Sequence, residues 1–242
     1  MVFDNHTHTT ISNLRLLDCI NDPIQLIDKA IELGLAGIAI TDHEALCAHM
    51  DVNEYAKKLQ ETHPEFTIAL GDEIYLTDTR DKGQKYYHFI LIAKDAIGHR
   101  CLRELSTKAW LNSYYDRGME RVPLLKEELE SIYSRFRGHL IATTACLGGE
   151  LGTSVLNLID CENALDTINA QRYHNQIAVF LEYCLDLFGD DFYIEVAPAK
   201  SKDQIAANKR FAMIAKAFGI KMCVGSDSHY LRKEDRYVHK AY

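Results

Sequence analysis

The feature that most constrains the fold is an alternation between short β-rich apolar runs and longer segments with helical periodicity. Seven runs of the first kind occur, at 2–5, 36–41, 67–75, 86–93, 139–145, 192–197 and 221–226. Several are continuously apolar, which is typical of strands that are covered on both faces. The pattern predicts repeated βα units around a parallel sheet, and 242 residues suit one such domain.

Two helical segments carry clear start and stop signals. The first begins after Asp22, with Pro23 at the first helical position, and ends at Gly34. The second begins after Ser201 and ends at Gly219. The least regular region, 76–86, is predicted to be an exposed turn or lid between two strands.

Residues that can bind metals gather where the predicted strands end. Five of the seven runs hold or lead into such residues: His6 and His8, Asp42 and His43, Glu73, Cys146, and Asp227 and His229. In a βα barrel the C-terminal strand ends meet at one mouth, where reactive groups belong. Residues two apart on extended chain point the same way, so each His-x-His or Asp-x-His pair can chelate. His88 sits within its run rather than at its end, and Asp18 lies on the loop after the first strand.

Each of these groups also has an ordinary structural interpretation. A His-x-His near a terminus is often incidental, and Cys146 alone would be a small buried hydrophobe. Asp42 is assigned to capping a helix that starts at His43, rather than to ligation. What favours a metal site is the joint placement of all the groups at one end of one barrel.

Charge and cysteine content narrow the function classes. A formal net charge of −8 argues against a broadly basic nucleic-acid surface. Three divalent ions would add about six positive charges, however, so acidity does not exclude a phosphate substrate. Seven cysteines without a Cys-x-x-Cys pair indicate reduced thiols. With no apolar run long enough for a membrane span and no signal peptide, we expect a cytoplasmic protein without membrane contact.

Six motifs together resemble a known family. "HTHT", "ITDHEAL", "GDEIYL", "YHFILIAKD", "TTACLGGEL" and "GSDSHYLRKEDRYVHKAY" are similar to the PHP (polymerase and histidinol phosphatase) domain, in the version found in the bacterial DNA polymerase III alpha subunit. The resemblance covers essentially the whole chain. It implies a single domain over 1–242, built as a distorted seven-stranded (β/α)7 TIM-like barrel with a trinuclear metal site at the C-terminal mouth of the strands. The chain is then either a fragment of a larger replicative polymerase or a free-standing relative.

The resemblance also implies a set of ligands. The nine matching positions are His6, His8, Asp18, His43, Glu73, His88, Cys146, Asp227 and His229. By analogy, one metal takes the residues predicted to be catalytic, namely His6, His8, Glu73 and Asp227. A second takes Asp18, His43 and His229, a third takes His88 with Cys146, and Glu73 bridges. The segment between His8 and Asp18 is longer than in many family members. This departure concerns the assignment of Asp18 as a ligand. Mixed nitrogen, oxygen and sulfur ligands suit zinc, with manganese as a second candidate.

The activity implied is metal-dependent phosphoester hydrolysis, in the form of 3′ to 5′ proofreading of a single-stranded or mismatched DNA end. The expected partners are the polymerase core or other replisome subunits. Two alternatives stay open: a stand-alone phosphatase for a small ester such as histidinol phosphate, and a non-catalytic scaffold stabilised by metals. Candidate contacts to DNA phosphates are Arg80, Lys82 and Lys85, with Arg117 and Arg121. Candidates for base stacking are Tyr114 and Tyr115.

Overall fold

The seven predicted runs form neighbouring strands of one barrel-like sheet. The computed structural model describes residues 2–15, 17–81, 83–116 and 118–239. The strands are β1 (Phe3–Thr7), β2 (Gly37–Ile40), β3 (Thr67–Thr77), β4 (Tyr87–Ala93), β8 (Leu140–Thr143), β9 (Phe192–Val196) and β10 (Lys221–Val224). They are hydrogen-bonded side by side in this order, which is also their order in the sequence. The alternation of apolar runs therefore predicts these seven strands correctly.

The direction of β4 departs from the predicted all-parallel sheet. The β1–β2, β2–β3, β8–β9 and β9–β10 pairs are parallel, whereas β4 is antiparallel to both β3 and β8. A hairpin-like connection of nine residues (78–86) joins β3 to β4, so no helical crossover is needed. The start of β4 consequently lies at the same end of the sheet as the end of β3, where Tyr75 pairs with His88.

The two ends of the sheet meet through the segment that follows β10. The backbone N–H of His8 donates to the carbonyl of Ser228 (3.1 Å), and that of Asp227 donates to the carbonyl of His6 (2.9 Å). Thr7 and Ser228 also form a parallel bridge. These bonds nearly close the sheet and bring the first and last motifs of the chain together.

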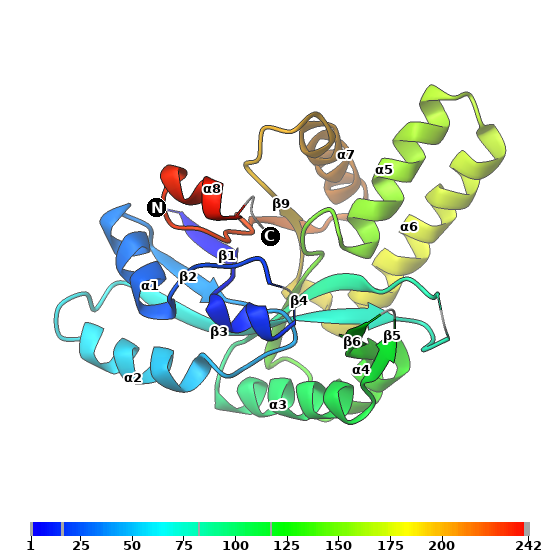
Figure 1. The fold of residues 1–242 in the computed structure, drawn as a ribbon. Coiled ribbons are helices and arrows are strands. Elements are labelled where there is room, and N and C mark those ends of the chain that lie inside the picture. Colours follow the sequence, from blue (N-terminus) through cyan, green and yellow to red (C-terminus); the bar gives the residue numbers. More distant parts are fainter. Residues whose placement is uncertain (1, 16, 82, 117, 240–242) are drawn as a thin grey trace.

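Helices cover the outside of the sheet, as Figure 1 shows. They are α1 (Pro23–Glu32), α2 (His49–Leu59), α3 (Ala96–Leu111), α4 (Lys126–Tyr133), α5 (Glu150–Asn163), α6 (Thr167–Phe188), α7 (Lys202–Phe218) and α8 (Arg236–His239). Three 3-10 turns, η1 (Thr10–Leu14), η2 (Gly189–Asp191) and η3 (Lys233–Asp235), complete the connections. The antiparallel pair α5 and α6 extends away from the sheet. In the part of the chain that the structure describes, no helix combines the length and apolarity needed to cross a membrane.

The two helices with strong local signals form as predicted. Asp22 accepts hydrogen bonds from the N–H groups of Ile24 and Gln25 and so caps α1. The hydroxyl of Ser201 accepts from the N–H of Gln204 at the start of α7, which ends at Gly219 in the left-handed conformation (φ 70°).

The larger apolar core lies between the sheet and helices α3 to α7. Phe89 and Leu91 of β4 are buried in it, and Phe89 meets Phe180 of α6 edge to face at 6.3 Å. Burying each such side chain contributes on the order of 1.5–3 kcal/mol. A smaller core, which includes Ile27 and Ile38, fixes α1 and α2 to β2. These two cores hold the helices against the sheet that carries the mouth.

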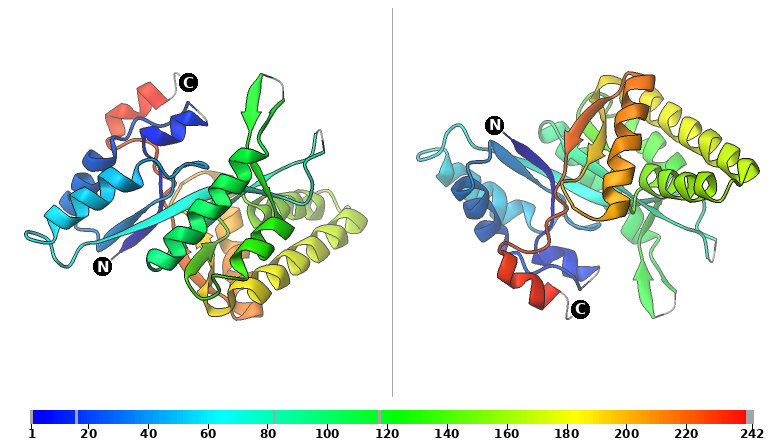
Figure 2. Two further views of the ribbon diagram at one scale, coloured as in Figure 1. Left: turned by 90° about the horizontal axis from the view of Figure 1, so that it is seen from below. Right: turned by 90° about the horizontal axis from the view of Figure 1, so that it is seen from above.

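Three short strands have no counterpart in the predicted elements. β5 (Tyr114–Asp116) and β6 (Met119–Arg121) form a separate hairpin, and β7 (Pro123–Leu125) pairs with β3. Three residues each are too few to show an alternating pattern. Figure 2 shows that this hairpin, the β3–β4 connection, η1 and α8 all project from the same side of the molecule.

Candidate metal centre

The centre begins with two histidines at the end of β1. His6 and His8 are two residues apart and both are fully buried. Their Nε2 atoms face each other at 3.0 Å. A hydrogen bond from Thr7 Oγ1 to the carbonyl of Ala39 (2.6 Å) ties the intervening residue to β2. The strand therefore delivers both imidazoles to one cavity, as the His-x-His spacing predicts.

Each of the two imidazoles is held by its other nitrogen. Nδ1 of His6 lies 2.7 Å from Oε1 of Glu195, and Nδ1 of His8 lies 3.0 Å from Oγ of Ser12. The Ser12 hydroxyl donates to Asp42 (2.7 Å), so it accepts from His8. With Nδ1 donating in both rings, the Nε2 lone pairs face the cavity, which is the arrangement that metal-binding histidines adopt.

Glu73 and Asp227 complete a four-residue group with these histidines. Nε2 of His6 lies 3.4 Å from Glu73 Oε1 and 3.3 Å from Asp227 Oδ1. Nε2 of His8 lies 3.5 Å from Glu73 Oε2 and 3.2 Å from Asp227 Oδ1. Ligands about 2.0–2.1 Å from a tetrahedral zinc are about 3.3 Å apart. The four distances from imidazole nitrogen to carboxylate oxygen, 3.2–3.5 Å, are therefore of the size expected between ligands of one divalent cation.

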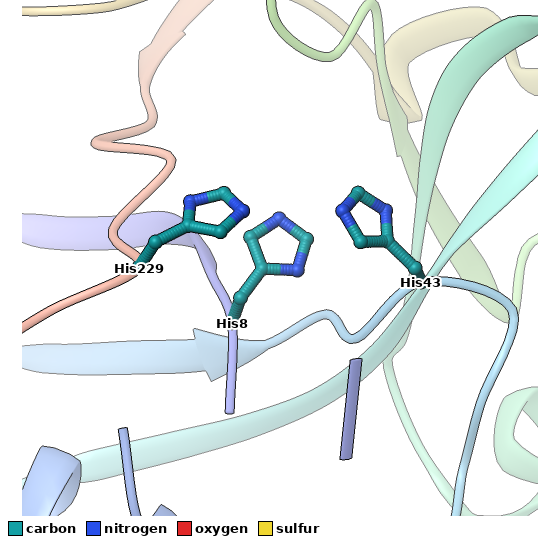
Figure 3. A group of neighbouring side chains, drawn as sticks. All are labelled: His8, His43 and His229. Atoms are coloured by element: carbon teal, nitrogen blue, oxygen red, sulfur yellow. The ribbon is translucent and has the colours of Figure 1, made fainter. Parts of the chain in front are cut away.

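A second group adjoins the first. Nitrogens of His8, His43 and His229 lie within 4.8 Å of one another, and Figure 3 shows the three rings converging from separate segments. Oδ2 of Asp18 lies 3.5 Å from Nε2 of His229 and 3.9 Å from Nε2 of His43. Oδ1 of Asp18 is buried without a hydrogen-bond partner in the described residues, as expected of an atom that faces a cation site.

The longer segment before Asp18 does not carry it away from the mouth. This segment folds into η1, and Asn13 within it accepts hydrogen bonds from the N–H groups of Asp18 and Cys19 (3.1 and 3.0 Å). Asn13 also donates to the carbonyl of Cys19 (2.7 Å). The loop is thus folded back so that Asp18 reaches His43 and His229.

His88 and Cys146 lie on the other side of Glu73. Nδ1 of His88 is 3.0 Å from Glu73 Oε1 and 3.7 Å from Cys146 Sγ. His88 lies within a predicted strand, so the sequence alone does not place it at the mouth. It lies there because β4 runs antiparallel to its neighbours. Oε2 of Glu73 lies 2.5 Å from Nδ1 of His43, so the two oxygens of one carboxylate face two different groups. The structure therefore brings all nine predicted ligands together.

The electrostatics of the cluster favour positive charge. Burial raises the pKa of Glu73, but the imidazoles of His88, His43 and His6 outweigh it and hold that pKa well below its usual range. Burial lowers the pKa of His88, yet the Glu73 carboxylate raises it to about 11. The pKa of His229 shifts in the same direction: burial alone would lower it, but Asp18 and Asp227 outweigh burial and raise it to about 9. His8 is the exception, because burial and the neighbouring His43 lower its pKa to about 3, which leaves its imidazole in the neutral form that binds metals. A metal cation would replace the protons held on the other imidazoles.

Glu195 is a functional candidate that sequence reasoning missed. It is buried in β9, and its Oε2 accepts from the Thr143 hydroxyl (2.7 Å) while Oε1 contacts His6. A Cβ at Gly225 would lie 2.3 Å from Glu195 Oε1, so only glycine lets the loop carrying Asp227 pass so close. A single acidic residue within the apolar run "FYIEVA" was the available signal.

The role predicted for Asp42 is wrong. No helix starts at His43, because α2 begins at His49. Asp42 instead accepts from the N–H of Thr9 (2.6 Å), the hydroxyl of Thr9 (2.8 Å) and that of Ser12. It therefore fixes the start of η1 and, through Ser12, the orientation of His8.

The basic residues predicted on the β3–β4 connection differ in their surroundings. Arg80 donates to both carboxylate oxygens of Glu128 and to the carbonyl of Pro123, so its charge is neutralised within the fold. Lys85 is exposed, with Nζ 3.4 Å from the Thr153 hydroxyl. Lys82 lies outside the described residues.

The fold and this site define an α/β protein with a nearly closed barrel-like sheet whose mouth is lined by imidazoles, carboxylates and one thiol. The chain belongs to the PHP domain family, which it matches over residues 4–199. It is 41% identical to the probable DNA polymerase YorL of Bacillus subtilis, and the match covers 98% of this chain and 19% of that protein. It is 30% identical to the DNA polymerase III alpha subunit of Borreliella burgdorferi, over 95% of this chain and 18% of that subunit. The chain thus spans about a fifth of the length of these relatives.

Solved structures share the fold at low sequence identity. A protein from Bifidobacterium adolescentis, assigned to the metal-dependent phosphoesterases, superimposes with a TM-score of 0.55 at 15% identity, over 95% of this chain and 88% of that one. An amidohydrolase from Chromobacterium violaceum, with bound sulfate and no metal, gives the same TM-score at 14% identity and the same two coverages. These likenesses establish the barrel-like fold.

Proposed function

We propose that this chain is a metal-dependent phosphoesterase that removes nucleotides from the 3′ end of DNA, in the context of a DNA polymerase of the polymerase III alpha type. The observation that carries the proposal is the group formed by His6, His8, Glu73 and Asp227, in which each imidazole Nε2 lies 3.2–3.5 Å from both carboxylates, a spacing that suits ligands of one cation. The polymerase relatives supply the reason for choosing DNA as the substrate.

We assign the nine side chains to three divalent cations, zinc first and manganese as the alternative. His6, His8, Glu73 and Asp227 would hold one cation, with roles in catalysis. Asp18, His43 and His229 would hold a second, and His88 with Cys146 a third. Glu73 suits a bridging role because its Oε1 faces His6 and His88 while its Oε2 faces His8 and His43.

The chemistry divides between the cations and the chain. Bound divalent cations lower the pKa of water and neutralise charge on phosphoryl oxygens, so no side-chain nucleophile is required. The chain's own residues keep the donors oriented. Glu195 and Ser12 hold the Nδ1 protons of His6 and His8, and Asp42 fixes Ser12. Burial of His6, His8 and Glu73 excludes bulk water from the base of the mouth.

We propose contacts to DNA for individual residues of the β3–β4 connection. Lys85 is exposed on the β3–β4 connection and is retained as a phosphate contact. Arg80 could reach a phosphate only by giving up Glu128, so we expect it mainly to position the connection. Lys82 is retained as a phosphate contact from its place in the sequence.

The test is hydrolysis of a 5′-labelled single-stranded oligonucleotide by the purified chain, with zinc or manganese. His8→Ala and Asp227→Asn remove predicted ligands, and His174→Ala, an exposed residue of α6, is the matched control. We expect stepwise shortening from the 3′ end by the wild type and by the control variant, and none by the other two. The substrate para-nitrophenyl phosphate is run alongside.

Two results would replace the proposal with an alternative. Hydrolysis of para-nitrophenyl phosphate together with intact DNA would indicate a phosphatase for small esters. If neither substrate reacts, and chelation of metals lowers the melting temperature, the metals stabilise a non-catalytic scaffold.

A further inference from the structure

The segment between His8 and Asp18 also delivers an arginine to the edge of the mouth. Arg15 follows η1 directly, and its guanidinium lies over the ring of Trp110 in α3, 5.4 Å from the centroid. One of its terminal nitrogens donates to the carbonyl of Glu120 in β6 (2.6 Å). Arg15 therefore lies between the metal-binding loop and the β5–β6 hairpin.

A row of aromatic rings leads from the candidate metal centre to this place. The ring of Tyr75 is stacked against His43 at 5.8 Å and lies 5.1 Å from His88. Tyr86 follows at 6.1 Å from Tyr75, and the guanidinium of Arg121 lies over Tyr86 at 5.6 Å. Tyr75, Tyr86 and Arg121 are only partly buried. Figure 2 shows the β5–β6 hairpin, which carries Arg121, and the β3–β4 connection, which carries Tyr86, projecting from the same side of the molecule.

The two arginines retain hydrogen-bonding capacity for an anion. In the described residues neither Arg15 nor Arg121 forms an ion pair with a carboxylate, whereas Arg80, Arg135 and Arg210 all do. Among the described residues each uses one terminal nitrogen in a hydrogen bond, Arg15 to the carbonyl of Glu120 and Arg121 to the sulfur of Met119 (3.0 Å). Both guanidinium groups are already oriented by stacking on an aromatic ring, which lowers the entropy cost of binding a phosphate.

We propose that Arg15, Tyr75, Tyr86 and Arg121 form a subsite for single-stranded nucleic acid next to the metal centre. The tyrosine rings would stack on unpaired bases, and the guanidinium groups would contact the backbone phosphates between them. This inference rests on the proposed function and deepens it, because the subsite selects an unpaired strand over a small phosphomonoester. A nucleotide offers both the π face of its base and a charged phosphate oxygen. An aromatic ring next to a guanidinium can therefore contact both parts.

The test compares two substrates across four variants. Arg15→Gln and Tyr86→Leu remove a cation and a ring, whereas Tyr86→Phe keeps the ring. Arg100→Gln is the charge-matched control on the exposed face of α3. For each protein, kcat and KM are measured on an oligothymidylate and on para-nitrophenyl phosphate. Binding of a fluorescent oligothymidylate is measured over a range of salt concentrations.

We expect KM for the oligonucleotide to rise about tenfold in Arg15→Gln and about 5- to 150-fold in Tyr86→Leu, the effect of losing one stacked base. These losses should exceed any change in KM for para-nitrophenyl phosphate. The slope of log affinity against log salt should fall in magnitude by about 0.7 in Arg15→Gln, which corresponds to one lost phosphate contact. Tyr86→Phe should restore binding.

The failures are distinguishable. If the wild type degrades DNA but Arg15→Gln and Tyr86→Leu match Arg100→Gln, the subsite is refuted and the proposed function stands. Equal losses on both substrates with a lower melting temperature would show a purely structural role for Arg15 and also refute the subsite. If the wild type cleaves para-nitrophenyl phosphate and neither binds nor degrades DNA, both proposals fall.

Discussion

Replacing Glu195 tests whether the histidine pair of β1 is held for metal binding. Glu195 is buried, its Oε1 lies 2.7 Å from Nδ1 of His6, and its Oε2 accepts from Thr143 at 2.7 Å. Glu195→Gln keeps the shape and can still accept from His6, but it loses the charge. Glu195→Ala leaves the buried N–H of His6 without its partner and opens a cavity.

The expected loss of metal affinity follows from the position of Glu195, which supports the predicted ligand His6. Loss of such a supporting group typically weakens metal affinity 10- to 100-fold, or about 1.4–2.7 kcal/mol. We expect Glu195→Gln at the lower end, because one hydrogen bond survives, and Glu195→Ala at the upper end. The control is Glu130→Gln, which removes an exposed carboxylate from α4.

The assay is competition for zinc between the protein and a chromophoric chelator, with circular dichroism to confirm folding. The tightest sites should weaken in both Glu195 variants and stay unchanged in Glu130→Gln. A folded Glu195→Ala protein with wild-type affinity at every site would refute the assignment of His6 as a ligand supported by Glu195.

Three further predictions concern the other groups. Asp18→Asn should lower the metal content by one ion per chain, whereas Asp22→Asn, at the cap of α1, should not; a full complement in Asp18→Asn, measured by elemental analysis, would remove Asp18 from the ligands. Cys146→Ser should abolish the thiolate-to-metal absorption band of the cobalt-substituted protein, and a retained band would place the thiolate elsewhere. His229 has a pKa raised to about 9, so its proton stabilises the metal-free fold fully below about pH 6.5 and progressively less as pH rises to about 9. The melting temperature of the metal-free wild type should therefore fall over this interval relative to that of His229→Asn. Parallel curves of melting temperature against pH for the two proteins would contradict the raised pKa.

Much of the fold could be predicted because its signals are local. Several of the runs that became strands are continuously apolar, and Asp22, Ser201 and Gly219 mark helix ends through contacts with residues only a few positions away. The direction of β4 has one local signal, the connection of nine residues (78–86), which is shorter than a crossover between parallel strands needs. The expectation of a parallel sheet does not use this signal, and β4 is antiparallel to both β3 and β8.

The candidate site divides in the same way. His6 with His8 and Asp227 with His229 are visible because residues two apart share a face of extended chain. The position of His88 depends on the reversed β4. Glu195 meets His6 across 189 positions of sequence, and such contacts between distant segments cannot be read from spacing. The error at Asp42 has a similar cause, since it caps a turn that precedes it by some thirty residues.

The most direct test of the proposed centre is anomalous X-ray diffraction at the zinc edge from crystals of the zinc-loaded chain. We predict three peaks at the mouth of the barrel: one contacting His6, His8, Glu73 and Asp227, one contacting Asp18, His43 and His229, and one contacting His88 and Cys146. The absence of a peak between His6, His8, Glu73 and Asp227 in fully loaded crystals would contradict the metal centre and the hydrolytic function proposed from it.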